Sequence, residues 1–192
     1  MDYTNPNLIG RATKNINRPK QIRTVKANTK DSIFEKNKLR IIPLGGLQEV
    51  GKNITVFEYG NDIVVLDCGM AFPDEEMPGV DIVIPDFAYL EKNQDKIRAV
   101  VLTHGHEDHI GGLPYFLKEI NVPVYGTKLT LGLVEHKLKE HNLLGSVKLV
   151  RVRHGETVTA GKLFSVEFIT TNHSIADSVA LAIKTPAGTV VH

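Results

Sequence analysis

The sequence has little that would mark a secreted, membrane-bound or strongly basic protein. Its 192 residues contain one cysteine, Cys68, which excludes an internal disulfide framework and favours a reducing cytoplasm. No apolar run approaches the roughly 20 residues of a membrane span. No apolar segment follows the basic N-terminus, as a secretory signal would require. The formal net charge is only +1, so no overall basic field indicates nucleic acid.

The positive charge that is present gathers at the N-terminus. Residues 1–40 hold ten lysines and arginines against three acidic residues. Residues 1–38 have few large apolar side chains and no helical or alternating period, so we predict a disordered basic arm there and a folded part over 39–192. Two interpretations of the arm stay open: a loose electrostatic contact with RNA phosphates, or a solvated tail without a binding role.

The most informative stretch is a cluster of imidazole and carboxylate side chains. His104, His106, Asp108 and His109 lie within six residues, after the apolar run Ile97–Leu102. Both groups are ligands of zinc and similar divalent ions. Histidines at i and i+2 project to the same side of an extended segment, and a bend at the intervening glycine lets Asp108 and His109 turn toward a second ion. Two ions roughly 3.5–4 Å apart would clamp an in-line displacement. The alternative is a polar surface loop that happens to be rich in histidine.

A glycine-rich segment nearly matches a phosphate-binding loop. Residues 46–53 follow the pattern G-x-x-x-x-G-K-[ST], except that Asn53 replaces the hydroxyl that would hold magnesium. The β-branched and aromatic residues Ile54–Tyr59 then predict a strand, whereas a phosphate-binding loop must open a helix. We therefore reject nucleoside-triphosphate binding and predict a tight glycine loop.

Two further polar residues follow predicted strands. Asp67 ends the apolar strand 62–66, which should form a hairpin with 54–59. An acid at the end of a buried strand is costly unless it is paired; a turn-starting aspartate is the alternative. His173 follows the alternating strand 162–169, where a lone histidine is usually structural.

The pattern His-x-His-x-Asp-His resembles that of the metallo-β-lactamase superfamily. The wider set of motifs is similar to the bacterial ribonuclease J family, in the β-CASP nuclease branch. These motifs are Pro43–Asn53, Leu66–Gly69, Asp81–Asp86 and Asn172–Ser178. The resemblance covers residues 39–192 and implies a fold of the α/β class, an αββα sandwich of two mixed β-sheets packed face to face with helices outside.

The resemblance also implies a centre of two divalent metal ions, with zinc expected and manganese or magnesium as alternatives. The expected ligands are His104, His106 and His173 for one ion, and Asp108 and His109 for the other. Asp108 is the expected catalytic residue, because it is positioned to accept a hydrogen bond from the attacking water. Asp67 is expected to orient the metal loop through hydrogen bonds. The glycine loop is expected near the mouth of the site.

The implied activity is metal-dependent hydrolysis of RNA, endonucleolytic and 5′-to-3′ exonucleolytic, in mRNA decay and rRNA maturation. RNA is then the partner, and assembly as a homo-oligomer or with a paralogous subunit is expected. In that family the strand ending at His192 leads into a bridging aspartate, a β-CASP domain and a C-terminal region. We therefore expect this chain to be the N-terminal part of a longer enzyme, poorly active alone.

Two other functional classes stay open. One is a different hydrolase of the superfamily, such as a glyoxalase II-like thioesterase, which the motif Gly45–Asn53 disfavours. The other is a non-catalytic, RNA-binding partner subunit, which the intact cluster of residues 104–109 disfavours.

Overall fold

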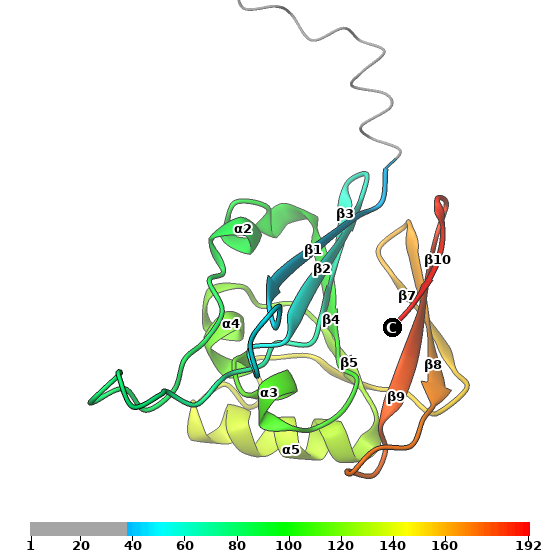
Figure 1. Ribbon diagram of the computed structural model, residues 1–192. Coiled ribbons are helices and arrows are strands. Elements are labelled where there is room, and N and C mark those ends of the chain that lie inside the picture. The colour runs from blue at the N-terminus through cyan, green and yellow to red at the C-terminus, as the bar shows by residue number, and fades with distance from the viewer. Residues whose placement is uncertain (1–37) are drawn as a thin grey trace, which may run out of the picture.

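The computed structural model describes residues 38–192, so the arm predicted over 1–38 lies outside the described residues except for Lys38. The described chain forms two β-sheets packed face to face, with helices against one of them (Figure 1). The first sheet holds, in spatial order, β1 (Arg40–Gly45), β2 (Ile54–Tyr59), β3 (Asp62–Leu66), β4 (Ile97–Val101), β5 (Val124–Gly126) and β6 (Leu149–Arg151). The second holds β10 (Gly188–Val191), β9 (Val179–Thr185), β8 (Phe164–Thr170) and β7 (Thr157–Ala160). The helices are α2 (Ala88–Glu91), the 3-10 helix η1 (Gln94–Lys96), α3 (Glu107–Ile110), α4 (Leu113–Glu119) and α5 (Lys128–Glu140).

The first sheet is mixed, as predicted. Strands β1, β2 and β3 pair antiparallel, whereas β3, β4, β5 and β6 pair in parallel. The hairpin expected over 54–66 is present as β2 and β3. All five residues of β3 are buried, because this strand lies inside the sheet and both of its faces are covered. Ile63 and Val65 face the helices, and Val64 and Leu66 face the second sheet.

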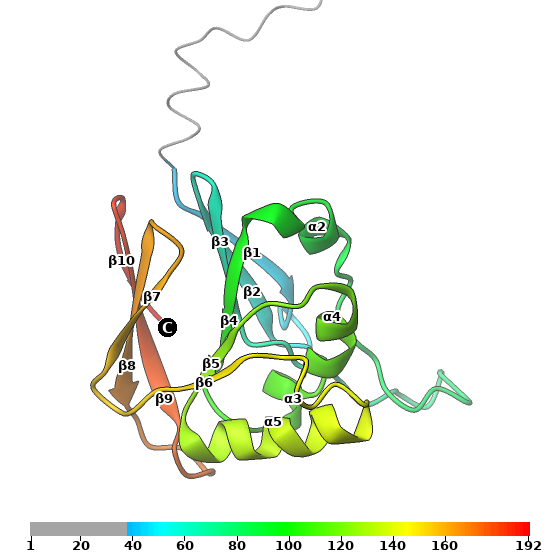
Figure 2. The same ribbon diagram turned by 180° about the vertical axis from the view of Figure 1, so that it is seen from behind.

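The second sheet departs from the prediction of two mixed sheets, because all of its strand pairs are antiparallel. Its strands β7 and β8, like β9 and β10, are joined by turns of a few residues. Such turns reverse the chain, whereas parallel neighbours need a crossover of about a dozen residues or more. Within residues 38–192 the helices cover only the outer face of the first sheet, so the described layers are helix, sheet and sheet (Figure 2).

Two separate hydrophobic cores hold these layers together. Phe116 and Leu113 of α4 pack with Phe87 and Leu90 against the helix-facing side of the first sheet. The second core lies between the sheets and contains the large rings of Phe57, Phe164 and Phe168. The two sheets are therefore fixed against each other, and residues that follow their strands can meet at a common edge. No helix within residues 38–192 has the length and apolarity needed to cross a membrane.

Candidate metal centre

The parallel pairing of β3 and β4 places two predicted site segments side by side. Leu66 lies opposite Val101 in the register, so both strands end at the same edge of the sheet. Asp67 continues from β3 and its N–H donates to the carbonyl of Val101 at 3.0 Å. The segment that carries His104 and His106 continues from β4 into α3. The predicted strand–loop–helix setting of the histidine cluster is therefore present.

Three imidazoles converge at this edge. The ring centroids of His104 and His106 are 4.8 Å apart, and that of His173 lies 4.6 Å and 4.9 Å from them. Their possible ligand atoms all lie within 4.8 Å of one another. Because His173 follows β8 of the second sheet, the trio bridges the two sheets. The predicted association of His173 with the distant cluster is thus found in the geometry.

The loop that carries His173 is tied to the first sheet by several hydrogen bonds. Val179 donates its N–H to the carbonyl of Thr103 at 3.0 Å. Asp177 accepts the N–H of Leu129 at 3.1 Å, and its carbonyl accepts the hydroxyl of Thr127 at 2.9 Å. These bonds join the loop to the start of α5. They fix where an otherwise exposed histidine lies.

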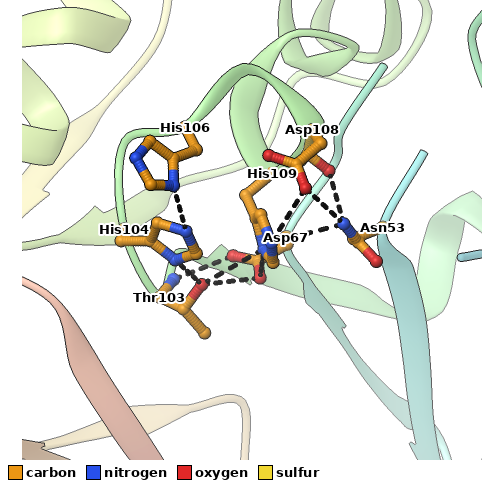
Figure 3. A network of polar contacts seen from close by, with 7 residues as sticks. All are labelled: Asn53, Asp67, Thr103, His104, His106, Asp108 and His109. Atoms are coloured by element: carbon orange, nitrogen blue, oxygen red, sulfur yellow. Dashed lines mark hydrogen bonds and ion pairs between the residues drawn. The ribbon is translucent and has the colours of Figure 1, made fainter. Parts of the chain in front are cut away.

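Asp67 is buried at the centre of a polar network (Figure 3). Its Oδ1 accepts the N–H of Thr103 at 2.8 Å, and its Oδ2 accepts the hydroxyl of Thr103 at 2.7 Å. The same Oδ2 lies 2.7 Å from Nδ1 of His109. The backbone of Asp67 has φ of +55°, a conformation that aspartate adopts more readily than most residues. The expected pairing of this carboxylate is therefore present, and a simple turn-starting role does not describe it.

This network determines which ring nitrogens face the centre. The ionised carboxylate of Asp67 only accepts, so His109 donates from Nδ1 and keeps a lone pair on Nε2. The hydroxyl proton of Thr103 goes to Asp67, so its oxygen accepts Nδ1–H of His104 at 2.9 Å. Nε2 of His104 then faces Nδ1 of His106 at 3.1 Å. The lone pair of His104 Nε2 can accept an N–H of His106 or bind a cation, and a set of convergent imidazole nitrogens fits a divalent ion.

Burial and charge shift the pKa values of His104 and His109 in opposite directions. Burial, reinforced by the nearby His109, lowers the pKa of His104 to about 4, so this imidazole is neutral and can donate a lone pair at neutral pH. Burial also acts to lower the pKa of His109. The hydrogen bond that His109 donates to Asp67 and the negative charges of Asp67 and Asp108 outweigh it, so the pKa of His109 is raised.

Asp108 and His109 form a second group beside the trio. Nε2 of His109 lies 3.5 Å from Oδ2 of Asp108, whose side chain is 42 % exposed. The ring of His109 lies 4.1 Å from that of His104, centroid to centroid. A cavity of about 290 Å³ opens at these rings and is lined by His104, His109 and His173 among others. Three of the five predicted ligand residues therefore line one cavity, and the other two, His106 and Asp108, contact His104 and His109 beside it.

Sequence reasoning gave two residues of this network no role. The sequence prediction contains no role for Thr103, and Asn53 enters it only as a mismatch to a phosphate-binding motif. The amide of Asn53 donates to Asp108 and contacts His109. A hydroxyl next to the first histidine could have signalled Thr103. Cys68, beside Asp67, is fully buried, and burial raises the pKa of its thiol, which fits a packing role.

Comparison with known proteins agrees with this geometry. Residues 47–184 match the family model of the metallo-beta-lactamase superfamily. Ribonuclease J of Synechocystis sp. is 52 % identical over 80 % of this chain and 24 % of that protein. Ribonuclease J of Thermus thermophilus is 50 % identical over 80 % and 28 %, and that of Helicobacter pylori strain 26695 is 44 % identical over 90 % and 25 %. The chain thus spans about a quarter of the length of these curated relatives.

Solved structures resemble this one at the level of the fold. A protein of unknown function from Enterococcus faecalis superposes with a TM-score of 0.61 at 19 % identity, over 80 % of this chain and 42 % of that one. The metallo-beta-lactamase fold protein YhfI from Bacillus subtilis gives 0.55 at 24 % identity, over 81 % and 62 %. Similarity to ribonucleases J extends over most of the chain and is not limited to the short motifs noted in the sequence. The family model covers well over half of the residues, and this chain belongs to the metallo-β-lactamase superfamily.

Proposed function

We propose that the protein is a metal-dependent ribonuclease that hydrolyses phosphodiester bonds in RNA. The observation that carries this proposal is the convergence of His104, His106 and His173 from two sheets onto one point. The chain that carries this site is 42–52 % identical to several ribonucleases J over about 80 % of its length. The fold supports hydrolysis with divalent metal, and the similarity supports RNA as the substrate class.

The donor set supports two ions, with zinc favoured over manganese or magnesium. Four of the five proposed ligands are imidazoles, which suit zinc, whereas magnesium prefers oxygen ligands. The proposed assignment is His104, His106 and His173 for one ion and Asp108 and His109 for the other. Such ions polarise a phosphoryl oxygen and lower the pKa of a bound water toward about 7.

The chain's own residues would then orient the metal ligands and take a proton from the attacking water. The carboxylate of Asp108 is part-exposed at the centre, where it can accept a hydrogen bond from the attacking water. Asp67 holds His109 in the tautomer whose Nε2 carries a lone pair. Through the hydroxyl of Thr103 it does the same for His104. The centre is thereby pre-organised before any substrate arrives.

We also propose the wider context that the resemblance to ribonuclease J implies. Residues 39–192 would be the N-terminal part of a metallo-β-lactamase domain, acting on RNA in both endonucleolytic and 5′-to-3′ exonucleolytic modes. Supporting roles in mRNA decay and rRNA maturation, and assembly with itself or with a paralogous subunit, rest on that similarity alone. A cytoplasmic location is supported by the single buried cysteine.

The test uses the longest reading frame that contains this chain, assayed on 5′-monophosphorylated RNA with added Zn²⁺ or Mn²⁺. His104→Ala should lower the rate of hydrolysis by more than the roughly 100-fold typical of losing a supporting residue, with little loss of RNA binding. The matched control is His136→Ala, an exposed histidine of α5, which should keep full activity. Hydrolysis of a thioester substrate but not of RNA would favour the thioesterase alternative. Bound metal with neither activity would favour a partner subunit.

A further inference from the structure

The glycine loop of residues 46–53, which resembled a phosphate-binding motif, has a different place in the structure. It is followed by strand β2 rather than a helix, which confirms the rejection of that motif. Gly46 and Gly51 have φ of +82° and +95°, so the loop turns tightly through left-handed backbone. It lines a cavity of about 160 Å³ together with Asp67 and His109. The loop therefore reaches the metal centre, as the resemblance implied.

Backbone hydrogen bonds lock the end of this loop to the two segments that carry site residues. The N–H of Asn53 donates to the carbonyl of Asp108 at 3.0 Å, and the N–H of Gly69 donates to the carbonyl of Asn53 at 3.0 Å. A Cβ at Gly69 would lie 1.6 Å from the carbonyl oxygen of Asp108, so only glycine allows this approach. Asn53 consequently has a fixed backbone beside both proposed ligands of the second ion.

The side chain of Asn53 uses its amide hydrogens on these two residues (Figure 3). Nδ2 lies 3.0 Å from the carbonyl oxygen of Asp108, 3.1 Å from its Oδ2 and 3.3 Å from Nε2 of His109. Oδ2 of Asp108 and Nε2 of His109 are both electron-rich and only 3.5 Å apart. Two such acceptors repel each other and turn apart unless a positive group lies between them. Before an ion binds, the amide N–H groups serve that purpose, and the ion then replaces the amide at the single lone pair of Nε2.

We propose that Asn53 is a positioning residue for the second metal position, which its amide keeps assembled by holding Asp108 and His109 toward each other. This inference rests on the proposed function, because it assumes that Asp108 and His109 bind an ion. Ordering two side chains costs conformational entropy, and a protein that has ordered them in advance binds the ion more tightly. The first position, formed by His104, His106 and His173, makes no hydrogen bond with Asn53 in the described chain. Loss of the amide should therefore affect the two positions unequally.

The experiment compares wild type, Asn53→Ala and Asn93→Ala in the longest reading frame that contains this chain, titrated with Zn²⁺ by calorimetry. Asn93 is a matched control, because its Nδ2 also donates to a backbone carbonyl, that of Tyr89, but away from the centre. Wild type should bind two ions. Asn53→Ala should weaken the second by about 10–100-fold and leave the first unchanged, and Asn93→Ala should change neither. Co²⁺ absorption spectra provide a second readout of the same two positions.

The outcomes separate the failure of this inference from that of the proposed function. If wild type and Asn53→Ala bind both ions and the affinity at each position is the same in the two proteins, the inference is overturned and the proposed function remains intact. A wild type that binds one ion would overturn the second position, and one that binds none would overturn both proposals. If Asn53→Ala does not fold, Asn53→Ser keeps a polar group near Asp108 but is too short to reach both ligands. It should show the same selective loss.

Discussion

Strand β3 has an aspartate at each end. The two carboxylates differ in whether their hydrogen-bond partners keep a lone pair that could bind a metal ion. Asp62 begins the strand and Asp67 follows it, with exposed fractions of 4 % and 2 %. Asp62 accepts from Nε of Arg98 at 2.6 Å and from the N–H groups of Lys162 and Leu163. Burial alone would have identified both as unusual, yet only Asp67 lies at the candidate metal centre.

The difference lies in the chemistry of the partners. Arg98 is a permanent cation, and its other donors bind the carbonyls of Asp95 and Asn61. The interaction of Asp62 with Arg98 therefore ends in backbone carbonyls, and the N–H groups of Lys162 and Leu163, between β7 and β8, tie Asp62 to the second sheet. Asp67 pairs with Thr103 and His109, and the remaining nitrogen of His109 keeps a lone pair that points into the centre. A buried carboxylate indicates a functional site when its partners retain binding capacity of their own.

Cavity size would have pointed to the wrong end of the molecule. A cavity of about 890 Å³ lies beside Asp62 and Arg98, whereas the cavity at the histidines holds about 290 Å³. The polar groups of the Asp62 and Arg98 pair are already matched to each other and to backbone. Convergent nitrogen and oxygen ligand atoms, rather than volume, distinguish the candidate metal centre.

The largest effect that would sharpen this comparison is expected from Asp67→Asn. An amide at this position can donate to Nδ1 of His109, which would move the ring proton to Nε2 and remove the lone pair from the centre. We expect Zn²⁺ affinity to fall by about 10–100-fold, measured by calorimetry. Asp62→Asn should leave the affinity unchanged. Equal losses in the two variants would show that the two ends do not differ as described.

The next effect concerns stability and should appear at the other end. Asp62→Asn leaves the guanidinium of Arg98 without its carboxylate. The loss matters because the Asp62 side chain is only 5 % exposed, so water cannot readily take the place of the missing partner. Removing one partner of a buried pair typically costs about 3–5 kcal/mol, and the part-exposure of Arg98 places the expected loss near the lower value. Urea unfolding of the metal-free chain measures it. A loss below about 1 kcal/mol, the size typical of surface ion pairs, would show that the Asp62–Arg98 pair does not behave as a buried one.

The smallest effect is a change in how stability depends on pH. Burial acts to raise the pKa of Asp62, but the bonds from Arg98, Lys162 and Leu163 outweigh it, so the pKa is lowered. A lowered folded pKa stabilises the fold above the unfolded value of about 3.9, and this contribution is lost as pH falls through the folded pKa. Urea unfolding between pH 6 and 3 should show wild type losing its advantage over Asp62→Asn below about pH 4. A constant difference would contradict the assignment.

Several features of the fold and the site were predictable because they depend on neighbouring residues. Strand alternation gave the hairpin of β2 and β3, and the close spacing of His104 to His109 gave the ligand cluster. The strand after the glycine loop was enough to reject a phosphate-binding loop. Asn53 could not be assigned, because its contacts with Asp108 and His109 join residues 55 and 56 positions apart. The second sheet was misjudged as mixed because periodicity shows where a strand lies but not the direction of its neighbour.

By itself, the sequence determined which side chains can bind metal and which local elements present them, since chemistry and short-range periodicity are written in adjacent residues. Only the tertiary structure decided which nitrogens of His104 and His109 face the centre. That choice follows from the parallel register of β3 and β4, which brings Asp67 to Thr103 across 36 positions of chain. It follows also from the packing of two sheets that delivers His173 to the same point. Contacts between distant segments form only when the whole core closes, so no local pattern can specify them.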